Sequence, residues 1–409
     1  MDKDLQPLFR FRLRIIFLAI GVMMVISIYQ YSWSLFAYGI RKDLGWDLAI
    51  LGMAFTLFNV GTFTQPFAGI IADLKGPRGV ALVGALLVGF GFILASVITR
   101  PWHLYLFYGI GGTGVGILYG VCAASAVKWF PDRRGLASGS VAFGFGAGTA
   151  IFNWFIQDWI AAYGFRATFV YVGIGMLVFL VPASFFYKYP PENWSSAFAG
   201  GGKKNAQPTV DYMPFEMLGT VQWYLVYFAF SFTISIVLMF AAQIKMMAKE
   251  FDLPANYFTL LLVLFPLGNG FSRMMGGAVS DKIGREKTMS IFYTLLGCTI
   301  FTLVYLGKNP LLFVVFFILA SLLGGSPYGI YPALIGDYYG PRYVTTNYGI
   351  TYTAKAWAGL ISGWASGYFV ALTGSYKFPL LLVAVGSLVA AALSGPWILK
   401  PPKQGPKGG

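Results

Sequence analysis

Twelve long apolar segments most limit what this chain can fold into. Each contains about 20 or more mostly apolar residues, enough for a helix to cross the hydrocarbon core of a bilayer. A spanning segment must satisfy its own backbone hydrogen bonds, which a helix does. The sequence therefore predicts an all-α membrane protein with twelve transmembrane helices. The expected spans are 13–40, 47–72, 79–99, 102–128, 135–162, 165–188, 220–248, 254–280, 286–307, 310–337, 343–373 and 376–399.

The composition agrees with this prediction. Of the 409 residues, 57% are hydrophobic and only 11% are charged, whereas a soluble domain has roughly 25% charged residues. A net charge of +14 would suggest a nucleic-acid partner for a soluble protein. Here the basic residues lie mainly in short loops, so we expect the lipid bilayer, and not nucleic acid, as the partner.

The distribution of Lys and Arg predicts the orientation. With the N-terminus inside, the cytoplasmic segments contain 19 basic residues and the outer loops contain 8. The positive-inside rule then places both termini in the cytoplasm. The first apolar run is too long for a signal-peptide core and is expected to stay as the first span. We expect a multi-pass monomer in the inner (cytoplasmic) membrane of the cell.

The two halves of the sequence repeat. The segment GIIADLKGPR begins at Gly69, after the second span, and GAVSDKIGREK begins at Gly277, after the eighth. Parallel repeats of six helices are typical of transporters in which two bundles rock about a central site. The predicted organisation is an N-terminal bundle at 1–188, a flexible cytoplasmic linker at 189–218, and a C-terminal bundle with a short basic tail at 219–409.

Two spans carry a basic residue at membrane depth, Arg273 and Lys355. A charge at the bilayer centre costs about 2.5–3.5 kcal/mol on insertion scales. In one interpretation Arg273 extends toward Asp281, eight residues or about 12 Å along the helix. No Asp or Glu lies in the middle of any apolar span to neutralise either cation. We therefore favour a site in which both cations bind an anionic substrate.

Polar and aromatic residues of other spans are expected to complete this site. Asn269 lies four residues before Arg273 and projects from the same helical face. Tyrosine hydroxyls can donate hydrogen bonds to a carboxylate while their rings exclude water, although packing alone explains any single tyrosine equally well. The candidates are Gln30, Tyr31, Tyr119, Phe145, Tyr328, Tyr331 and Tyr352.

The halves differ in charge. The two repeat segments begin 208 residues apart (277 minus 69). At this spacing Arg273 of the second half corresponds to Gln65 of the first, and Lys355 corresponds to about Phe145. We expect the C-terminal half to bind the anion and the N-terminal half to close over it.

Enzymatic and metal chemistry have little support. Cys122 and Cys298 both lie in apolar spans and His103 lies at a loop edge, so neither a disulfide framework nor a metal site is indicated. No HExxH, GxSxG or carboxylate pair lies within a span. We expect no enzyme activity and no cofactor. An anion channel, which needs a continuous pore, and a sensor without transport activity remain alternatives.

The loops after spans two and eight resemble those of the major facilitator superfamily, and the resemblance covers the whole chain. In that family the loop aspartate and basic residues form charge relays that latch the cytoplasmic side. Pro77 departs slightly from the pattern. The resemblance implies gating roles for Asp73, Lys75, Arg78, Asp281, Lys282 and Arg285.

A narrower resemblance is to the oxalate/formate antiporter family and the related bacterial monocarboxylate transporters. In the oxalate/formate relatives, the residues that match Arg273 and Lys355 bind substrate carboxylates. This resemblance implies secondary active transport of small organic carboxylates by alternating access. It rests on QYSW (30–33), GVGILYG (114–120), KWFPDRRGLASG (128–139), NGFSR (269–273), SDKIGR (280–285) and NYGITYTAK (347–355).

The substrate stays open between two classes. Gly324 and Gly325 stand near the place where oxalate-selective members carry a bulky Trp, which predicts a roomier cavity and favours a monocarboxylate such as lactate or pyruvate. Protons are the expected partner, with Lys355 as the carrier, because burial near Arg273 disfavours its charged form and an arriving anion restores it. Two cations suit two carboxylates, so oxalate/formate-type exchange is the alternative.

Overall fold

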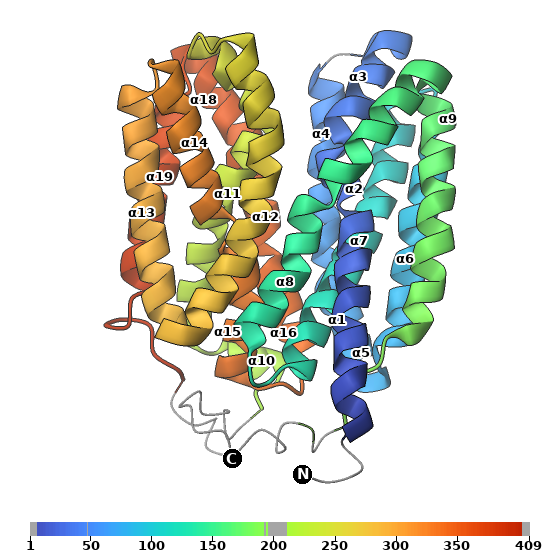
Figure 1. Cartoon of the computed structure of the whole chain (residues 1–409), viewed down its shortest axis with the longest axis vertical. Helices are drawn as coiled ribbons and strands as arrows, with labels where there is room; N and C mark the ends of the chain where they lie inside the picture. The colour runs from blue at the N-terminus through green and yellow to red at the C-terminus, as the bar shows by residue number, and fades with distance from the viewer. Residues whose placement is uncertain (1–5, 47, 192–193, 195–210, 403–409) are drawn as a thin grey trace.

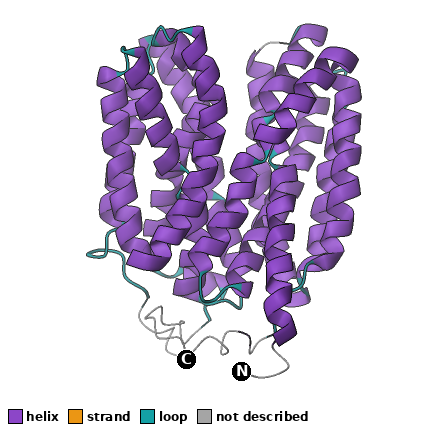
Figure 2. Cartoon of the chain, viewed as in Figure 1, coloured by secondary structure: helices purple, strands orange, loops and turns teal. Residues whose placement is uncertain are grey.

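The computed structural model describes residues 6–46, 48–191, 194 and 211–402, and every regular element within these ranges is a helix (Figures 1 and 2). The first half contains α1 (Gln6–Ile26), α2 (Ile28–Tyr31), α3 (Trp33–Leu44), α4 (Leu48–Val60), the 3₁₀ turn η2 (Gly61–Thr64), α5 (Gln65–Lys75), α6 (Pro77–Ala95), α7 (Pro101–Trp129), α8 (Arg134–Ala147) and α9 (Thr149–Phe186). The predicted all-α class is confirmed.

The second half follows the same plan. It contains α10 (Pro214–Leu218), α11 (Val221–Glu250), α12 (Ala255–Ile283), α13 (Arg285–Leu306), α14 (Pro310–Gly324), α15 (Pro327–Tyr339), α16 (Val344–Tyr352), α17 (Ala354–Leu360), the π-turn η4 (Ile361–Ala365), α18 (Ser366–Thr373) and α19 (Lys377–Leu393).

These helices form the twelve expected passes. Eight continuous helical segments of the described residues are long and apolar enough to cross a membrane. One of them, Arg134–Phe186, is 53 residues long and crosses twice, because the chain turns sharply at Gly164, whose φ is +77°. Three further passes consist of shorter helices: α4 with η2 and α5, α16 to α18, and α19.

Several passes are interrupted near the residues of interest. Pro66 has no N–H to donate to the carbonyl of Thr62, and the preceding turn Gly61–Thr64 is 3₁₀. The first pass, in contrast, stays helical through Ser27 and Ser32, on either side of the short α2. Discontinuous helices such as the pass with Pro66 are typical of substrate sites in transporters.

Helices α1 to α9 form one group and α11 to α19 the other (Figure 1). Helix α1 begins, and α19 ends, at the same end of the molecule, which we call the terminal end; the opposite end is the far end. The two groups lie close together at the terminal end, where α8 packs on α12 and α15 and α5 packs on α16, and diverge toward the far end. Most of the predicted linker at 189–218 lies outside the described residues, so the domain division stays a prediction.

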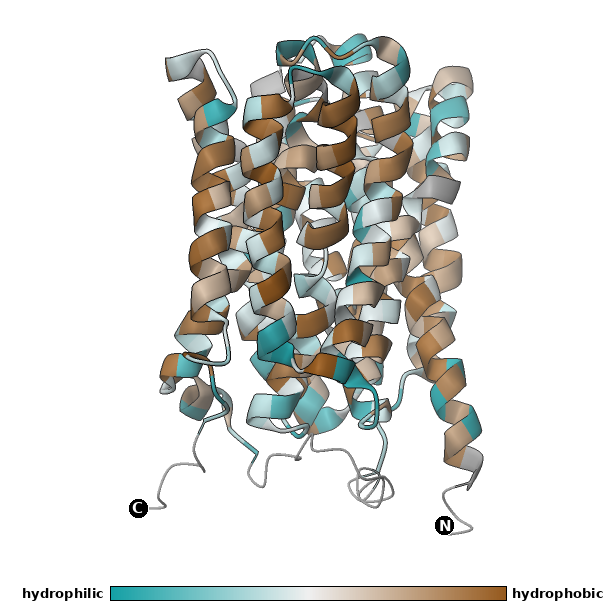
Figure 3. Cartoon of the chain, turned by 60° about the vertical axis from the view of Figure 1, so that its left-hand side comes forward, coloured by the Kyte–Doolittle hydropathy of each residue, from teal (hydrophilic) through white to brown (hydrophobic). Residues whose placement is uncertain are grey.

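Hydrophobic residues predominate along the length of the helices, and hydrophilic residues gather toward the ends (Figure 3). Large side chains such as Phe17 and Val178 are 71% and 70% exposed. Apolar surface on this scale is unfavourable in water, and it suits contact with lipid.

Glycines allow α8 and α12, which belong to different halves, to touch along their backbones. A Cβ atom at Gly146 would lie 2.6 Å from Cα of Gly270, and one at Gly139 would lie 2.9 Å from Cα of Met274. Helices in membranes approach this closely only where small residues face one another. Closure of the terminal end therefore depends on these glycines.

This packing predicts the effect of Gly139→Val. The added side chain should hold α8 and α12 apart and keep the terminal end open. Ala142, also on α8, is only 2% exposed. A cysteine that replaces it should then react with a water-soluble thiol reagent from the terminal side roughly five times faster or more. Gly175→Val is the control, since a side chain there meets nothing within 4 Å. An unchanged rate for Gly139→Val would show that closure does not need this contact.

Candidate functional site

Arg273 lies on α12 and is only 1% exposed. Its Nε donates a hydrogen bond to Oδ1 of Asn269 at 2.9 Å, as the four-residue spacing predicts. Its two Nη atoms donate across to the other half, to the hydroxyl of Tyr31 at 3.0 Å and to the carbonyl of Ala142 at 3.4 Å. Every one of these acceptors is a neutral oxygen.

Two aromatic rings flank the Arg273 guanidinium. Its Cζ lies 4.3 Å from the ring centroid of Tyr328 and 5.5 Å from that of Phe145. Both distances allow a cation–π attraction, worth about 0.5–2 kcal/mol depending on desolvation. The rings hold the guanidinium in place without neutralising it.

Lys355 is the second buried cation, on α17, and it is also 1% exposed. Its Nζ donates to Oε1 of Gln30 in the other half at 2.7 Å. The centroids of Phe58, Phe145 and Tyr352 lie 5.4, 5.7 and 5.7 Å from this nitrogen. Because Phe145 contacts both cations, Arg273 and Lys355 line one common site.

Tyr119, on α7, completes the aromatic wall. Its ring stacks on Tyr352 at 4.6 Å and meets Phe145 edge-on at 5.3 Å. Tyr331 lies elsewhere: it stacks on Phe230 at 4.3 Å, and no contact with either cation is given for the described residues. The structure thus brings together nine of the ten predicted site residues and leaves Tyr331 apart.

Neither cation takes part in an ion pair among the described residues. Buried charges in proteins are normally paired, because removing an unpaired charge from water is very costly. The donors of Arg273 and Lys355 meet only amide, hydroxyl and carbonyl oxygens. The site therefore carries an uncompensated positive charge that an anion would neutralise.

The expected extra room beside Gly324 and Gly325 is absent. A Cβ atom at Gly324 would lie 2.9 Å from Val237, and one at Gly325 would lie 3.1 Å from Ser272. Both glycines therefore serve close helix packing, and that prediction was wrong. It removes the argument that favoured a monocarboxylate over a dicarboxylate on grounds of space.

Asp73 joins the two halves at the terminal end. Its carboxylate accepts hydrogen bonds from the hydroxyl of Thr345 at 2.5 Å and from the backbone N–H of Thr346 at 2.8 Å. Lys128 forms an ion pair with the same carboxylate at 2.9 Å and donates to the carbonyl of Arg342 at 3.2 Å. Asp73 thus attaches the end of α5 to the start of α16.

A second cluster centres on Asp337, at the end of α15. Arg134 of the other half pairs with it at 2.7 Å, and Arg285 pairs with it at 2.9 Å. Asp281 accepts hydrogen bonds from two backbone N–H groups in the first turn of α8, at 2.9 and 2.7 Å, where the helix dipole favours an anion. Together with the Asp73 contacts, these interactions form what we call the terminal gate.

Tyr189 extends this gate outside the membrane-spanning segments. Its hydroxyl lies 2.8 Å from Oγ1 of Thr345, and Lys128 Nζ lies 4.0 Å from its ring centroid. Burial and the nearby Asp73 carboxylate raise the pKa of Tyr189 well above its usual value. The hydroxyl therefore stays neutral over the physiological pH range.

The other predicted gate residues lie outside this network. Arg78 donates to the carbonyl of Tyr187 at 3.1 Å, within its own half. Lys75 and Lys282 are exposed. The sequence did not identify the partners Lys128, Arg134 and Asp337, although Lys128 and Arg134 lie in the segment 128–139 that carries the family resemblance. It also missed Phe58 beside Lys355.

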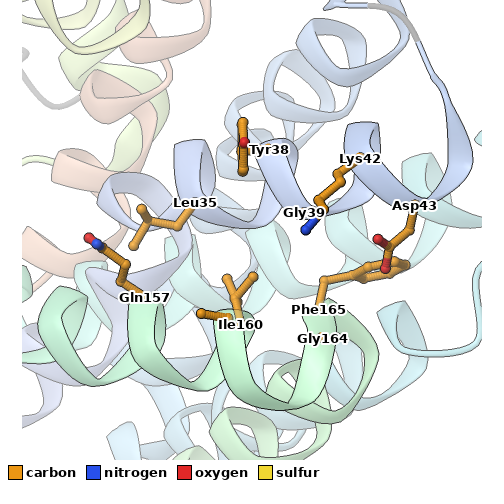
Figure 4. Close-up of a pocket in the computed structure, with 10 residues that line it drawn as sticks. Leu35, Tyr38, Gly39, Lys42, Asp43, Gln157, Ile160, Gly164 and Phe165 are labelled. Atoms are coloured by element: carbon orange, nitrogen blue, oxygen red, sulfur yellow. The ribbon is translucent and has the colours of Figure 1, made fainter.

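A surface cavity lies apart from these residues, between α3 and α9 of the first half (Figure 4). Leu35 and Ile160 line it from opposite helices, with Lys42 and Asp43 nearby. Both charged residues are exposed, so water solvates them and no uncompensated charge arises there. The two buried cations, and not this cavity, form the candidate site.

The sequence profile described as Major Facilitator Superfamily matches residues 16–244 and 223–408. The chain belongs to the major facilitator superfamily. The chain is 33% identical to "Oxalate:formate antiporter" of Oxalobacter formigenes, over 92% of this chain and 89% of that protein. It is 34% identical to "Uncharacterized 38 kDa protein in 23S RNA operon" of Thermoproteus tenax, over 92% and 94% of the two chains. Its resemblance to the oxalate/formate antiporter family is confirmed.

Solved structures agree on the fold. The proton:xylose symporter XylE, bound to 6-bromo-6-deoxy-D-glucose, matches with a TM-score of 0.74 at 13% identity, over 94% of this chain and 95% of that one. Identity this low supports the fold alone. The protein is a multi-pass membrane protein and a secondary transporter of small molecules.

The terminal gate predicts the effect of Asp337→Asn. The substitution removes the carboxylate that Arg134 and Arg285 share, and Arg285 keeps only its ion pair with Asp281 at 2.6 Å. Breaking a fully buried ion pair costs about 3–5 kcal/mol, and the cost is lower here because the Asp337 side chain is 18% exposed. We expect the melting temperature in detergent, followed by intrinsic fluorescence, to fall by roughly 5 °C or more. Lys282→Gln, at an exposed position, should leave it unchanged. Equal values for both variants would mean that the gate adds little stability.

Proposed function

We propose that this protein carries small organic carboxylates across the membrane by alternating access, with the anion held between Arg273 and Lys355. The observation that supports this most is the pair of buried cations whose partners are all neutral. Each cation also bridges the two halves, Arg273 to Tyr31 and Lys355 to Gln30. An anion bound there contacts both halves and can stabilise their closure.

The conformation supports alternating access. The halves are joined at the terminal gate and diverge toward the far end. From the distribution of Lys and Arg we propose that the terminal end faces the cytoplasm. Substrate then enters from the far end, which must open further because both cations are only 1% exposed, and opening of the terminal gate releases it inside. A channel would instead require a pore open at both ends.

We propose a dicarboxylate such as oxalate, exchanged for another small carboxylate, as the first candidate substrate. Arg273 and Lys355 both contact the ring of Phe145, and two neighbouring cations suit an anion with two carboxylates. A relative at 33% identity is an oxalate:formate antiporter. With no extra room at Gly324, the structure gives less support to the preference for lactate or pyruvate. Proton-coupled monocarboxylate transport is the second candidate. Lys355 supports it because its one hydrogen-bond partner among the described residues is the neutral Gln30, so no carboxylate holds the amine in its charged form.

Arg273 tests the site itself. Arg273→Gln removes the charge, and Arg273→Lys removes the planar fork that grips a carboxylate with two hydrogen bonds. We expect both variants to lower uptake of labelled oxalate or lactate into proteoliposomes by at least roughly a hundredfold, since a buried ion pair is lost. Uptake by Arg273→Gln within about twofold of the wild-type rate would contradict the proposed site.

Lys355→Gln separates the two substrate candidates. If a dicarboxylate bridges both cations, the variant loses a buried ion pair and should bind oxalate more than roughly a hundredfold more weakly. If Lys355 carries a proton beside a monocarboxylate, the variant should keep most of its lactate affinity and lose its response to an acid-outside pH gradient. Competition of oxalate, formate, pyruvate and acetate against labelled substrate measures the first effect.

A further inference from the structure

Gln65, the repeat counterpart of Arg273, is buried without a hydrogen-bond partner. It lies at the start of α5 and is 1% exposed. Neither Oε1 nor Nε2 of its amide has a partner among the described residues. A buried amide normally makes several hydrogen bonds, and an unsatisfied one costs stability. The function proposed above does not use this residue.

The surroundings of Gln65 belong to both halves. A Cβ atom at Gly120 of α7 would lie 3.0 Å from Cδ of Gln65, so the amide rests against that helix. A Cβ atom at Gly349 of α16, in the other half, would lie 3.1 Å from its backbone carbonyl carbon. The residue therefore sits at an interface that separates when α5 and α16 part.

Gln65 lies between the cations and the terminal gate. Gly349, its neighbour on α16, precedes Lys355 by six residues, or about 9 Å along a helix. In the other direction along α5, a Cβ atom at Gly69 would lie 2.7 Å from Cα of Thr346, and Asp73 binds Thr346. An anion that leaves the cations toward the terminal end must pass this level.

Two tyrosines precede the glycines that contact Gln65. Tyr119 precedes Gly120, and Tyr348 precedes Gly349; both are buried, and their hydroxyls interact with each other and with no further hydrogen-bond partner among the described residues. Tyr119 is also part of the wall of the central site, where it stacks on Tyr352. Donor groups thus continue from the cations toward the gate.

We propose that Gln65, Tyr119 and Tyr348 form an uncharged second binding station for the transported carboxylate, occupied when the terminal gate opens. This inference rests on the proposed function. The amide NH₂ and the two hydroxyls supply donors that match carboxylate oxygens. Because the station carries no charge, it binds the anion more weakly than the cations do and passes it on to water.

The test measures substrate affinity separately at each end. Inverted and right-side-out membrane vesicles present the terminal end and the far end, respectively, to labelled oxalate, with labelled lactate in parallel. Gln65→Leu should raise KM at the terminal end roughly tenfold, the loss expected for hydrogen bonds to a charged group. KM at the far end should stay within about twofold, because Arg273 and Lys355 are intact.

Folding is not expected to limit this test, because the Gln65 amide makes no hydrogen bond that the substitution would break. Gln65→Met, which is unbranched, should give the same difference between the two ends. Thr62→Val is the matched control: Thr62 is buried in the same pass, and its hydroxyl donates within its own turn to Asn59 at 2.8 Å. It should change neither KM.

Each other outcome contradicts the station. If both KM values of Gln65→Leu and Gln65→Met stay within about twofold of wild type, the amide is idle or holds only a buried water. If both values rise equally, Gln65 acts in the central site. Absence of saturable uptake by the wild type, or an equal rate for Arg273→Gln, would overturn the proposed function and the station with it.

Discussion

The uncompensated charge of Arg273 is the constraint on which the rest of the structure depends. A guanidinium in the middle of a bundle needs five hydrogen-bond acceptors and a counter-charge. The described residues supply neutral acceptors from both halves, Asn269 from its own helix and Tyr31 and Ala142 from across the interface. The hydrogen-bonding needs are thus partly met, while the charge is left for a ligand. If a carboxylate of the protein stood in place of one of these neutral acceptors, it would neutralise Arg273, and no anionic ligand would be needed.

Closure of the two halves and the position of this cation are mechanically linked. The backbone of α12 around Arg273 packs against glycines of α8, and Gly329 of α15 packs on the same stretch from its own half. Glycine leaves no side chain to absorb a displacement, so α8 cannot move away without opening the space beside Arg273. The terminal gate holds this arrangement through Asp281, which accepts hydrogen bonds from the first turn of α8. In the proposed function, neutralisation of Arg273 by the ligand and release of the terminal gate therefore act on the same pair of helices.

The spans, the repeat and both buried cations could be predicted from the sequence because each depends on local composition at a known depth. The partners across the bundle could not, because the pairing of Asp337 with Arg134, or the place of Phe58 beside Lys355, depends on how distant passes pack. Gly324 shows a further limit. A glycine in a membrane helix indicates either open space or a close helix contact, and its sequence context did not distinguish them. Here the close contact with α11 was the physical reason.

The unequal chemistry of the halves follows from what a carrier must do twice in each cycle. It must bind the anion firmly enough to remove it from water, and then release it on the other side of the membrane. If the half that moves away from the anion carried a charged group, that group would be left buried and unpaired after each movement, at a cost of about 3–5 kcal/mol. Neutral donors such as Gln30 and Tyr31 can exchange a carboxylate oxygen for water or for a side chain at little net cost. Both buried cations belong to the C-terminal half, and in the proposed cycle the N-terminal half, which closes over the anion, contributes the neutral groups Gln30 and Tyr31.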